Sequence, residues 1–332
     1  MVDDWTRAAL VESISPQAQR LGAMLEYHLG WRDEQLQLLN VPARAGKKLR
    51  PALVLLVSQA VTGEINAAAR NAAVAVELIH NFSLVHDDIQ DHNELRRHRR
   101  TVWSLWGMPQ GINAGDAFFA LAQRVLVREG SALAAAMAAE LNSTALLLAE
   151  GQFLDIDLQL GRTPVSLEAY ETMIARKTGV LFACACRLGA MAALAPEAIC
   201  DAYAAYGREL GAAFQEQDDL LGVWGQSTDT GKPEAADIVE RKRGLPAALA
   251  LSLTDAPEWL IAAYAHSDGA ADSELVRRII AHFDELDLRA IVEQRVEARY
   301  RAALEHLKAA GARAPARAYL TAICAALVSR RT

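Results

Sequence analysis

Apolar residues recur at intervals of three and four along most of the chain. This spacing places them on one face of an α-helix, and runs that alternate like half-buried strands are not found between turn residues. Prolines and glycines separate helical stretches of about 15 to 30 residues, which is typical of a large bundle. No fixed repeat and no Gly-, Ser- or Pro-rich linker marks a boundary. The pattern predicts an all-α protein in which residues 1–332 form a single large helical bundle.

One of these helices carries an acidic cluster, in the segment LIHNFSLVHDDIQDHNELRRHRRT at residues 78–101. Read as a helix, it places Asp87, Asp88 and Asp91 on one face, since they are three and four residues apart. Like charges at this spacing repel each other, and the runs before them are largely apolar, so a solvated acidic face is a poor explanation. Mg²⁺ takes oxygen ligands and often bridges to substrate phosphates. The cluster therefore indicates a cation site.

Basic residues flank this cluster. Arg96 and Arg97 follow Asp91 by about one and a half turns, and anion-binding groups beside a cation site suggest a phosphorylated substrate. His80 lies on the face of Asp87, either as a substrate contact or as a satisfied interhelical histidine. The earlier segment RAGKKLRP starts a helix, where backbone N–H groups favour an anion, although an ordinary basic helix start is the alternative. Its charged side chains after the glycine are those of Lys47, Lys48 and Arg50.

A second acidic cluster lies in FQEQDDLLGVWG, at residues 214–225. Gln215 shares a helix face with Asp218 and Asp219, which gives one polar stripe on an otherwise apolar helix. A polar loop with Lys232 at its tip follows, and a basic run that includes Lys242 ends the region. Acids on a helix before a lysine-bearing loop predict a second half of a phosphate site with a lid. A solvated helix end and a surface loop are the alternative.

Two other polar interruptions occur within apolar helices. Gln152 stands in one of them, and Lys177 with Thr178 stands in a later one. Each of these side chains costs core packing and so requires a buried polar partner or a ligand.

Composition narrows the class of protein. The chain has 332 residues, of which 52% are hydrophobic, and a formal net charge of −7, which argues against a general nucleic-acid binder. Four irregularly spaced cysteines fit small core residues in a reducing compartment better than a disulfide framework. The N-terminus lacks a signal-peptide pattern, and no run reaches the roughly 18 apolar residues of a membrane span. We expect a cytoplasmic protein without a transmembrane segment.

The sequence resembles the trans-isoprenyl diphosphate synthases of the polyprenyl synthetase family, which include farnesyl and geranylgeranyl diphosphate synthases. The resemblance lies in the order and spacing of these motifs, from about residue 44 to residue 246. The resemblance implies an isoprenoid-synthase-type bundle around a central cavity, a homodimer, and Mg²⁺-dependent condensation of isopentenyl diphosphate with an allylic prenyl diphosphate. It implies three Mg²⁺ held by Asp87, Asp88, Asp91, Asp218 and Asp219. Isopentenyl diphosphate would be held by Lys47, Arg50, His80 and Arg97. The allylic diphosphate would be contacted by Arg96, Lys177, Gln215, Lys232 and Lys242, with Thr178 and Gln152 in support.

The second acidic motif departs from the family pattern. Gly222 stands where a third aspartate is usual, and Gln226 stands where many relatives with that glycine carry an aspartate. Metal binding on that side is then expected to rest on Asp218 and Asp219. Gly244 replaces a hydroxyl residue that is usual after a pair of lysines.

Product length is predicted from Ser83 and Phe82, the fourth and fifth residues before Asp87. They lie about one turn deeper along the helix, where a growing prenyl tail would run, and a large aromatic there would form part of the cavity floor. In the resembled family this pattern is closest to synthases that stop at C20, with C15 or longer products as alternatives. A class I terpene cyclase would not need a second diphosphate pocket. A non-catalytic synthase subunit would be expected to have degraded aspartate motifs.

Overall fold

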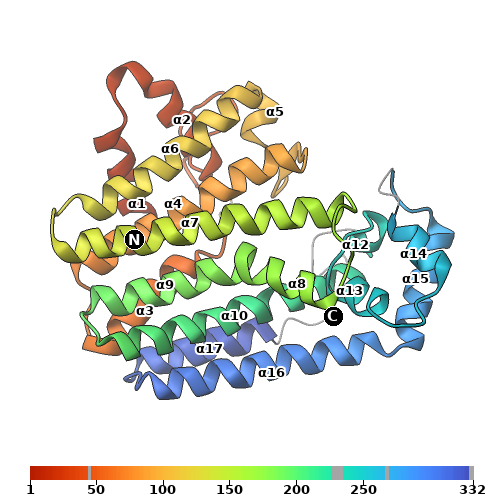
Figure 1. Ribbon diagram of the computed structural model, residues 1–332. Helices are drawn as coiled ribbons and strands as arrows, with labels where there is room; N and C mark the ends of the chain where they lie inside the picture. The colour runs from red at the N-terminus through yellow and green to blue at the C-terminus, as the bar shows by residue number, and fades with distance from the viewer. Residues whose placement is uncertain (44–45, 226–234, 266–268, 329–332) are drawn as a thin grey trace. The chain divides into compact units, whose positions relative to one another are not determined.

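The computed structural model describes residues 1–43, 46–225, 235–265 and 269–328 of the chain (Figure 1). Its elements are, in order, α1 (Val2–Ser13), η1 (Pro16–Ala18), α2 (Gln19–His28), α3 (Leu49–Thr62), α4 (Ala67–Gln90), β1 (Leu95–Arg96), β2 (Arg99–Arg100), α5 (Val102–Trp106), α6 (Met108–Val127), α7 (Ala132–Gln159), α8 (Leu167–Ile174), η2 (Ala175–Gly179), α9 (Val180–Ala192), α10 (Glu197–Trp224), α12 (Ala236–Val239), α13 (Leu245–Leu251), α14 (Glu258–Ala265), α15 (Ser273–Glu285), α16 (Leu288–Ala309) and α17 (Ala316–Val328). Among these residues the only strands are the two-residue pair β1 and β2, which are antiparallel. The all-α prediction is confirmed.

The contacts divide the chain into two compact units. The first unit comprises Met1–Ala145, Cys184–Asp201 and Gly311–Arg317, and the second comprises Leu146–Ala183, Ala202–Ala310 and Ala318–Thr332. The long helices α7, α9 and α10 therefore contribute residues to both units. Each unit carries one of the two acidic motifs.

In the first unit, α4 packs against α3 and α6. It begins at Asn66, whose side-chain oxygen accepts a hydrogen bond from the Ala69 N–H at 2.8 Å, a cap worth about 1 kcal/mol. The buried face of α4 includes Ala72, Val76 and Ile79, each fully removed from solvent. Small residues near the start of α4 allow close helix packing, and the buried face holds the C-terminal end of the helix, with its aspartates, in a fixed position.

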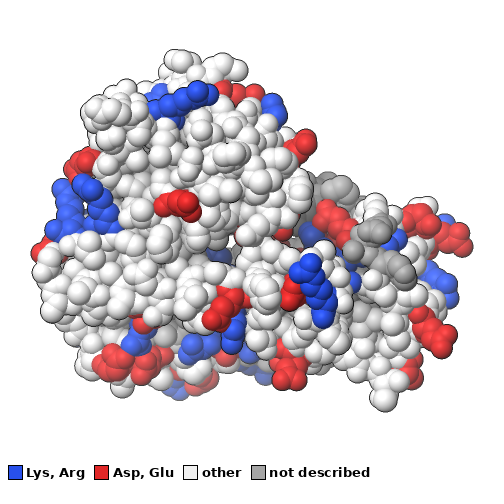
Figure 2. All heavy atoms as spheres, turned by 45° about the horizontal axis from the view of Figure 1, so that its top comes forward, with Lys and Arg blue, Asp and Glu red and all other residues white. Residues whose placement is uncertain are grey.

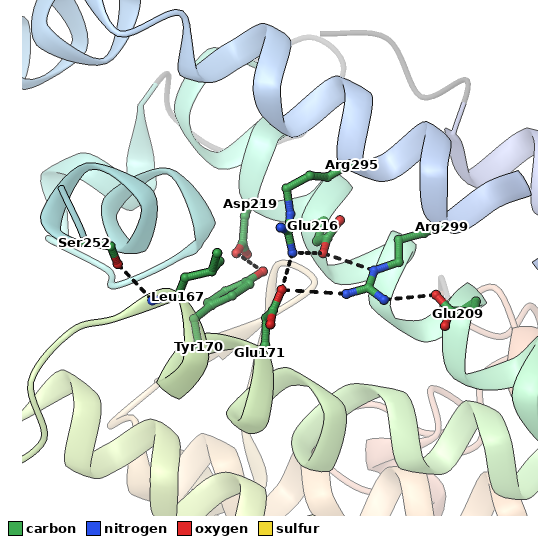
Figure 3. Close-up of polar contacts among 9 residues, drawn as sticks. All are labelled: Leu167, Tyr170, Glu171, Glu209, Glu216, Asp219, Ser252, Arg295 and Arg299. Atoms are coloured by element: carbon green, nitrogen blue, oxygen red, sulfur yellow. Dashed lines mark hydrogen bonds and ion pairs between the residues drawn. The ribbon is translucent and has the colours of Figure 1, made fainter. Parts of the chain in front are cut away.

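In the second unit, α8, α10, α13 and α16 enclose an apolar cluster that includes Tyr170, Leu220 and Val292. A polar network crosses the same helices (Figure 3). Glu216 of α10 is completely buried, and its Oε1 lies 3.3 Å from Arg295 and 3.4 Å from Arg299, both on α16. The network fixes the rotation of α10, which carries the second acidic motif.

All four cysteines are buried and free, as the sequence predicts. One described helix, α7, is long and apolar enough to cross a membrane by length and composition alone, and 39% of its apolar window is buried. Core helices of proteins outside membranes pass the same test.

Candidate active site

The first acidic motif lies at the C-terminal end of α4. The helix ends at Gln90, and Asp91 caps it by donating its backbone N–H to the carbonyl of Asp87 at 2.8 Å. The interpretation of residues 78–101 as one continuous helix is therefore wrong at its end. The chain turns into the β1–β2 hairpin, because His92 adopts a left-handed conformation with φ of 55°. This turn directs the arginines back toward the aspartates.

Asp88 is the best-defined group of this motif. Its carboxylate is buried, and Oδ1 accepts a hydrogen bond from Nε of Arg96 at 2.8 Å. Oδ2 is buried without a hydrogen-bond partner among the described residues. Burial raises the pKa of Asp88 to about 6, although the Arg96 guanidinium opposes the shift. A buried, unpaired anionic oxygen is costly, and a divalent cation would satisfy it.

A cation bound to Asp88 would need further oxygen ligands. Asp87 is partly exposed and Asp91 is exposed. Within the part of the chain that the structure describes, no three His, Cys, Asp or Glu side chains are grouped to enclose a metal ion. Mg²⁺ usually keeps several waters and shares one or two carboxylates with substrate phosphates, so this donor set fits it.

A small basic hollow lies beside Asp88 in the first unit. Its lining includes Arg96, Arg97, Arg99 and Arg100, together with His28. These side chains give the hollow a strong positive charge, which suits a diphosphate.

The basic residues predicted to hold isopentenyl diphosphate gather near this hollow. Nη1 of Arg50 lies 3.4 Å from Nε2 of His80. A Cβ atom at Gly46 would lie 2.6 Å from the Arg97 guanidinium, so the segment with Lys47 approaches that arginine closely. Burial, followed by the charges of Arg50 and Arg97, lowers the pKa of His80 well below its ordinary value. His80 is therefore neutral near pH 7 and contributes hydrogen bonds rather than charge.

His28, at the end of α2, is a residue that the sequence interpretation missed. Burial and the neighbouring Arg96 and Arg97 lower its pKa to about 3, so it is also neutral. A single histidine outside any motif gave no signal in the sequence.

Lys48 pairs with acidic residues of α1 and α4. Its Nζ lies 2.8 Å from Oε1 of Glu77 and 3.0 Å from Oδ1 of Asp3. Because Glu77 is buried in α4, this pair fixes the start of α3, and with it Arg50, against α4.

The second acidic motif lies on α10, within a chain of hydrogen bonds in the second unit. The Thr178 hydroxyl donates to Oε1 of Gln215 at 2.9 Å, and Nε2 of Gln215 donates to Oδ1 of Asp219 at 2.9 Å. The Tyr170 hydroxyl donates to Oδ2 of Asp219 at 2.7 Å (Figure 3). Burial raises the pKa of Asp219 to about 7, against the effect of these donors. Asp218, its neighbour, is partly exposed.

Lys177 and Thr178 lie in the π-helical turn η2. Lys177 forms an ion pair with Asp155 of α7. Gly151 makes this approach possible, since a Cβ atom there would lie 2.3 Å from the backbone nitrogen of Lys177. Gln152 is buried, and both polar atoms of its side chain are without hydrogen-bond partners among the described residues.

Lys242 is bound to acids of its own segment. Its Nζ lies 3.0 Å from Oδ1 of Asp237 and 2.9 Å from Oε2 of Glu240. Burial disfavours its charge, but the two carboxylates outweigh burial and raise its pKa. Lys232 lies outside the described residues.

Phe82 and Ser83, the residues predicted to set product length, lie on α4 about one turn before Asp87. The ring of Phe82 is 4.9 Å from that of His86 and 5.4 Å from that of Phe119 on α6. The Ser83 hydroxyl donates to the His80 carbonyl at 2.9 Å. Phe119 is a second aromatic at this place that the sequence interpretation did not identify.

Carboxylates at a helix end, an arginine-lined hollow beside them and a second acidic helix give this all-α protein the side chains that suit cations and phosphorylated ligands. The family model for polyprenyl synthetases matches residues 36–282. The chain therefore belongs to the polyprenyl synthetase family.

Individual relatives agree with this assignment. A (2E,6E)-farnesyl diphosphate synthase of Mycobacterium tuberculosis is 43% identical over 223 residues, which span 67% of this chain and 61% of that protein. The crystal structure of a polyprenyl synthetase from Streptomyces coelicolor, 34% identical, superposes with a TM-score of 0.88 over 98% of this chain and 96% of that one. A geranylgeranyl pyrophosphate synthase from Corynebacterium glutamicum, solved with isoprenyl diphosphate and magnesium, is 27% identical and superposes with a TM-score of 0.81 over 99% of each chain.

Proposed function

We propose that this protein is a Mg²⁺-dependent prenyltransferase that joins isopentenyl diphosphate to an allylic prenyl diphosphate. The observation that carries the proposal is Asp88, which lines a hollow rich in arginine and has a buried carboxylate oxygen without a partner among the described residues. A cation bound to this carboxylate and an anion bound by the arginines would lie side by side. A metal-bound diphosphate meets both requirements.

The two substrates would use different groups. Lys47, Arg50, His80 and Arg97 would hold isopentenyl diphosphate, with the neutral His80 donating or accepting a hydrogen bond. Arg96, Lys177, Gln215, Lys232 and Lys242 would contact the allylic diphosphate.

The reaction follows from this division. Bound Mg²⁺, three ions by family resemblance, would stabilise the negative charge that develops on the leaving diphosphate. Departure of the diphosphate breaks the C1–O bond of the allylic substrate and leaves an allylic carbocation, which the double bond of isopentenyl diphosphate then attacks. A proton then passes to the released diphosphate, which restores neutrality. The basic groups of the chain orient both diphosphates, and the apolar interior excludes water from the cationic carbon.

We further propose that residues 1–332 form one isoprenoid-synthase-like domain. Support comes from the solved relatives, which match this chain along almost its whole length. The product proposed is C20 geranylgeranyl diphosphate, with C15 farnesyl diphosphate as the alternative. Phe82 and Phe119 together would close the space that further five-carbon units need.

A homodimer is proposed from the surface of α7. Most exposed residues of this helix form an uncharged stripe, and the half-exposed side chain of Glu150 beside it pairs with Arg176. The stripe consists of Ala132, Ala135, Ala136, Ala139, Asn142, Ser143, Leu146, Ala149 and Phe153. In Figure 2 charged side chains are sparse over the first unit on the side where α6 and α7 face the viewer. An uncharged stripe of small residues with two large apolar ones suits a second copy of the same helix. The proposed location is the cytoplasm.

Product analysis with purified protein tests the function. A single allylic diphosphate supplied with Mg²⁺ but without isopentenyl diphosphate should remain unchanged, and addition of isopentenyl diphosphate should yield a longer chain. A cyclic hydrocarbon formed from the single substrate would identify a terpene cyclase instead. No turnover of either mixture would favour a non-catalytic synthase subunit.

A further inference from the structure

The second acidic motif has a glycine at its last acidic position, and another aspartate fills that space. A Cβ atom at Gly222 would lie 1.9 Å from Oδ2 and 2.4 Å from Cγ of Asp237. The Asp237 carboxylate therefore occupies the volume that a side chain at position 222 would take. Position 222 is one helical turn after Asp218, so side chains at the two positions are neighbours on the surface of α10. Asp237 thus brings a carboxylate next to Asp218 from a different helix, α12.

Asp237 is held in this place by a basic partner. Its Oδ1 lies 3.0 Å from Nζ of Lys242, while Oδ2 is the oxygen that lies over Gly222. A single methyl group at position 222 would force the carboxylate away. The glycine is thus required by the position of Asp237.

Both carboxylate oxygens of Asp219 accept hydrogen bonds from protein groups. Oδ1 accepts a hydrogen bond from Gln215, and Oδ2 accepts from the Tyr170 hydroxyl at 2.7 Å and from the Leu245 N–H at 2.8 Å. Only 7% of Asp219 is exposed. These donors come from α8, α10 and the first residue of α13, so the carboxylate joins three helices. A metal ion at Asp219 would have to displace donors that are already well placed.

We propose that Asp218 and Asp237 present the metal-binding carboxylates of the second site, and that Asp219 is a positioning residue that joins α8, α10 and α13. The proposal rests on the proposed function, because it assigns roles within the Mg²⁺–diphosphate site. It also accounts for Gly222, the departure from the family pattern that seemed to remove an acidic ligand.

An exchange of residues 222 and 237 tests the assignment of Asp237. Binding of Mg²⁺ in the presence of inorganic diphosphate is measured by calorimetry for the native protein, Asp237→Gly, Gly222→Asp and the double variant Gly222→Asp/Asp237→Gly. We expect Mg²⁺ affinity to fall at least tenfold in each single variant. Asp237→Gly removes a carboxylate, and in Gly222→Asp the two carboxylates cannot occupy the same volume. The double variant should recover to within threefold of the native affinity. Losses that add in the double variant would overturn the proposal.

The shape-conserving variant Asp237→Asn guards against a folding defect in Asp237→Gly. It keeps the size of the side chain and should still lose at least tenfold in Mg²⁺ affinity. An unchanged affinity would exclude Asp237 from the metal site.

Asp219→Asn and Tyr170→Phe test the other half of the proposal, by thermal unfolding without metal. Both should lower the unfolding midpoint, while Mg²⁺ affinity of the folded protein stays within threefold of native. A tenfold loss of Mg²⁺ affinity in Asp219→Asn at an unchanged midpoint would show that Asp219 is a ligand and would overturn the assignment. If the native protein neither binds Mg²⁺ with diphosphate nor elongates a prenyl chain, the proposed function itself fails. If it does both and the exchange does not restore binding, only this inference fails.

Discussion

Lys47 and Lys48 are adjacent in the sequence, and the structure distinguishes their roles. Lys48 pairs with Glu77 and Asp3, so its charge stabilises the start of α3. Lys47 lies on the segment that approaches Arg97, and Arg50 lies beside His80. A pair of like residues next to a glycine could not be divided into these roles from the sequence, because their partners are distant in the chain.

The variants Lys47→Ala and Arg50→Ala should raise KM for isopentenyl diphosphate much more than KM for the allylic partner. Each removes a charge-assisted contact worth about 1.5 to 3 kcal/mol, which corresponds to roughly 10- to 150-fold. Steady-state kinetics with each substrate varied in turn would measure the two constants, and Lys308→Ala, at an exposed position of α16, is a matched loss of charge. Equal increases for both substrates would show that the two pockets are wrongly assigned.

Magnesium binding should depend on pH through Asp88. Burial raises the pKa of this carboxyl from 3.8 to about 6, so the group takes up a proton as the pH falls through 6. The proton competes with Mg²⁺, and the contribution of Asp88 to Mg²⁺ affinity should fall about tenfold per pH unit below that pKa and level off above it.

Calorimetric titration of Mg²⁺ from pH 5 to pH 8 would measure this dependence. Diphosphate also takes up protons in this range, so the informative quantity is the difference between native protein and Asp88→Asn. A difference that does not vary with pH would mean that Asp88 titrates outside this range.

Phe82→Ala should shift the product to C25 or beyond, because loss of the Phe82 ring from α4 opens space beside Phe119 of α6. Products formed from radiolabelled isopentenyl diphosphate would be separated by chain length. Phe119→Ala provides the comparison from the other helix and should shift the product in the same direction. An unchanged product in a fully active Phe82→Ala variant would remove Phe82 from the cavity floor.

At the level of elements, periodicity was sufficient to predict the helices but not where they end. The helices α4 and α10 could be predicted because the spacing of their apolar residues is a local property of the sequence. The end of α4 at Gln90 and the hairpin after it depend on positive φ angles at His92, Arg97 and His98, residues that give no strong turn signal. The contact of Arg96 with Asp88 follows from that hairpin. The contacts of Tyr170 and Asp237 with α10 join distant segments, so no local pattern indicated them.

Glu216 illustrates an element held by buried charge. It stands within the second acidic motif, yet it faces Arg295 and Arg299 rather than a ligand. Glu216→Ala should lower the free energy of unfolding by about 1.5 to 3 kcal/mol, because it removes charge-assisted contacts to two partly buried arginines, which keep Glu171 as a shared partner. Chemical denaturation monitored by circular dichroism would measure the loss.

The control for Glu216 is an exposed ion pair on α16, between Arg289 and Glu293. Both side chains of this pair are about half exposed, and Glu293→Ala should cost less than about 1 kcal/mol. Similar losses for Glu216→Ala and Glu293→Ala would contradict a structural role for the buried network.

At the level of the whole molecule, α7 has an exposed stripe of uncharged residues that runs from Ala132 to Phe153. Leu146 and Phe153 are its large apolar members, 63% and 61% exposed in the single chain. Light scattering during size-exclusion chromatography should give twice the chain mass for the native protein. Leu146→Glu with Phe153→Glu should give the monomer mass, because charges would face each other across a symmetric interface.

A matched variant pair on another surface controls for added charge. Leu194→Glu with Leu253→Glu places the same two charges at exposed leucines outside α7 and should leave the dimer intact. A native protein of single-chain mass at micromolar concentration would contradict the proposed dimer.

The π-helical turn at Ala175–Gly179 limits how the length of the chain can vary. Such a turn accommodates one residue more than the α-helical turn it replaces. Deletion of a single residue there would close the helix into regular geometry and rotate the side chains after the cut by about 100° relative to those before it. The contact of Lys177 with Asp155 and the contact of Thr178 with Gln215 could then not form at the same time. Point substitutions within the turn leave this geometry in place, whereas a deletion or insertion of one residue does not. The number of residues between α8 and α9 is therefore under a stricter constraint than their identity.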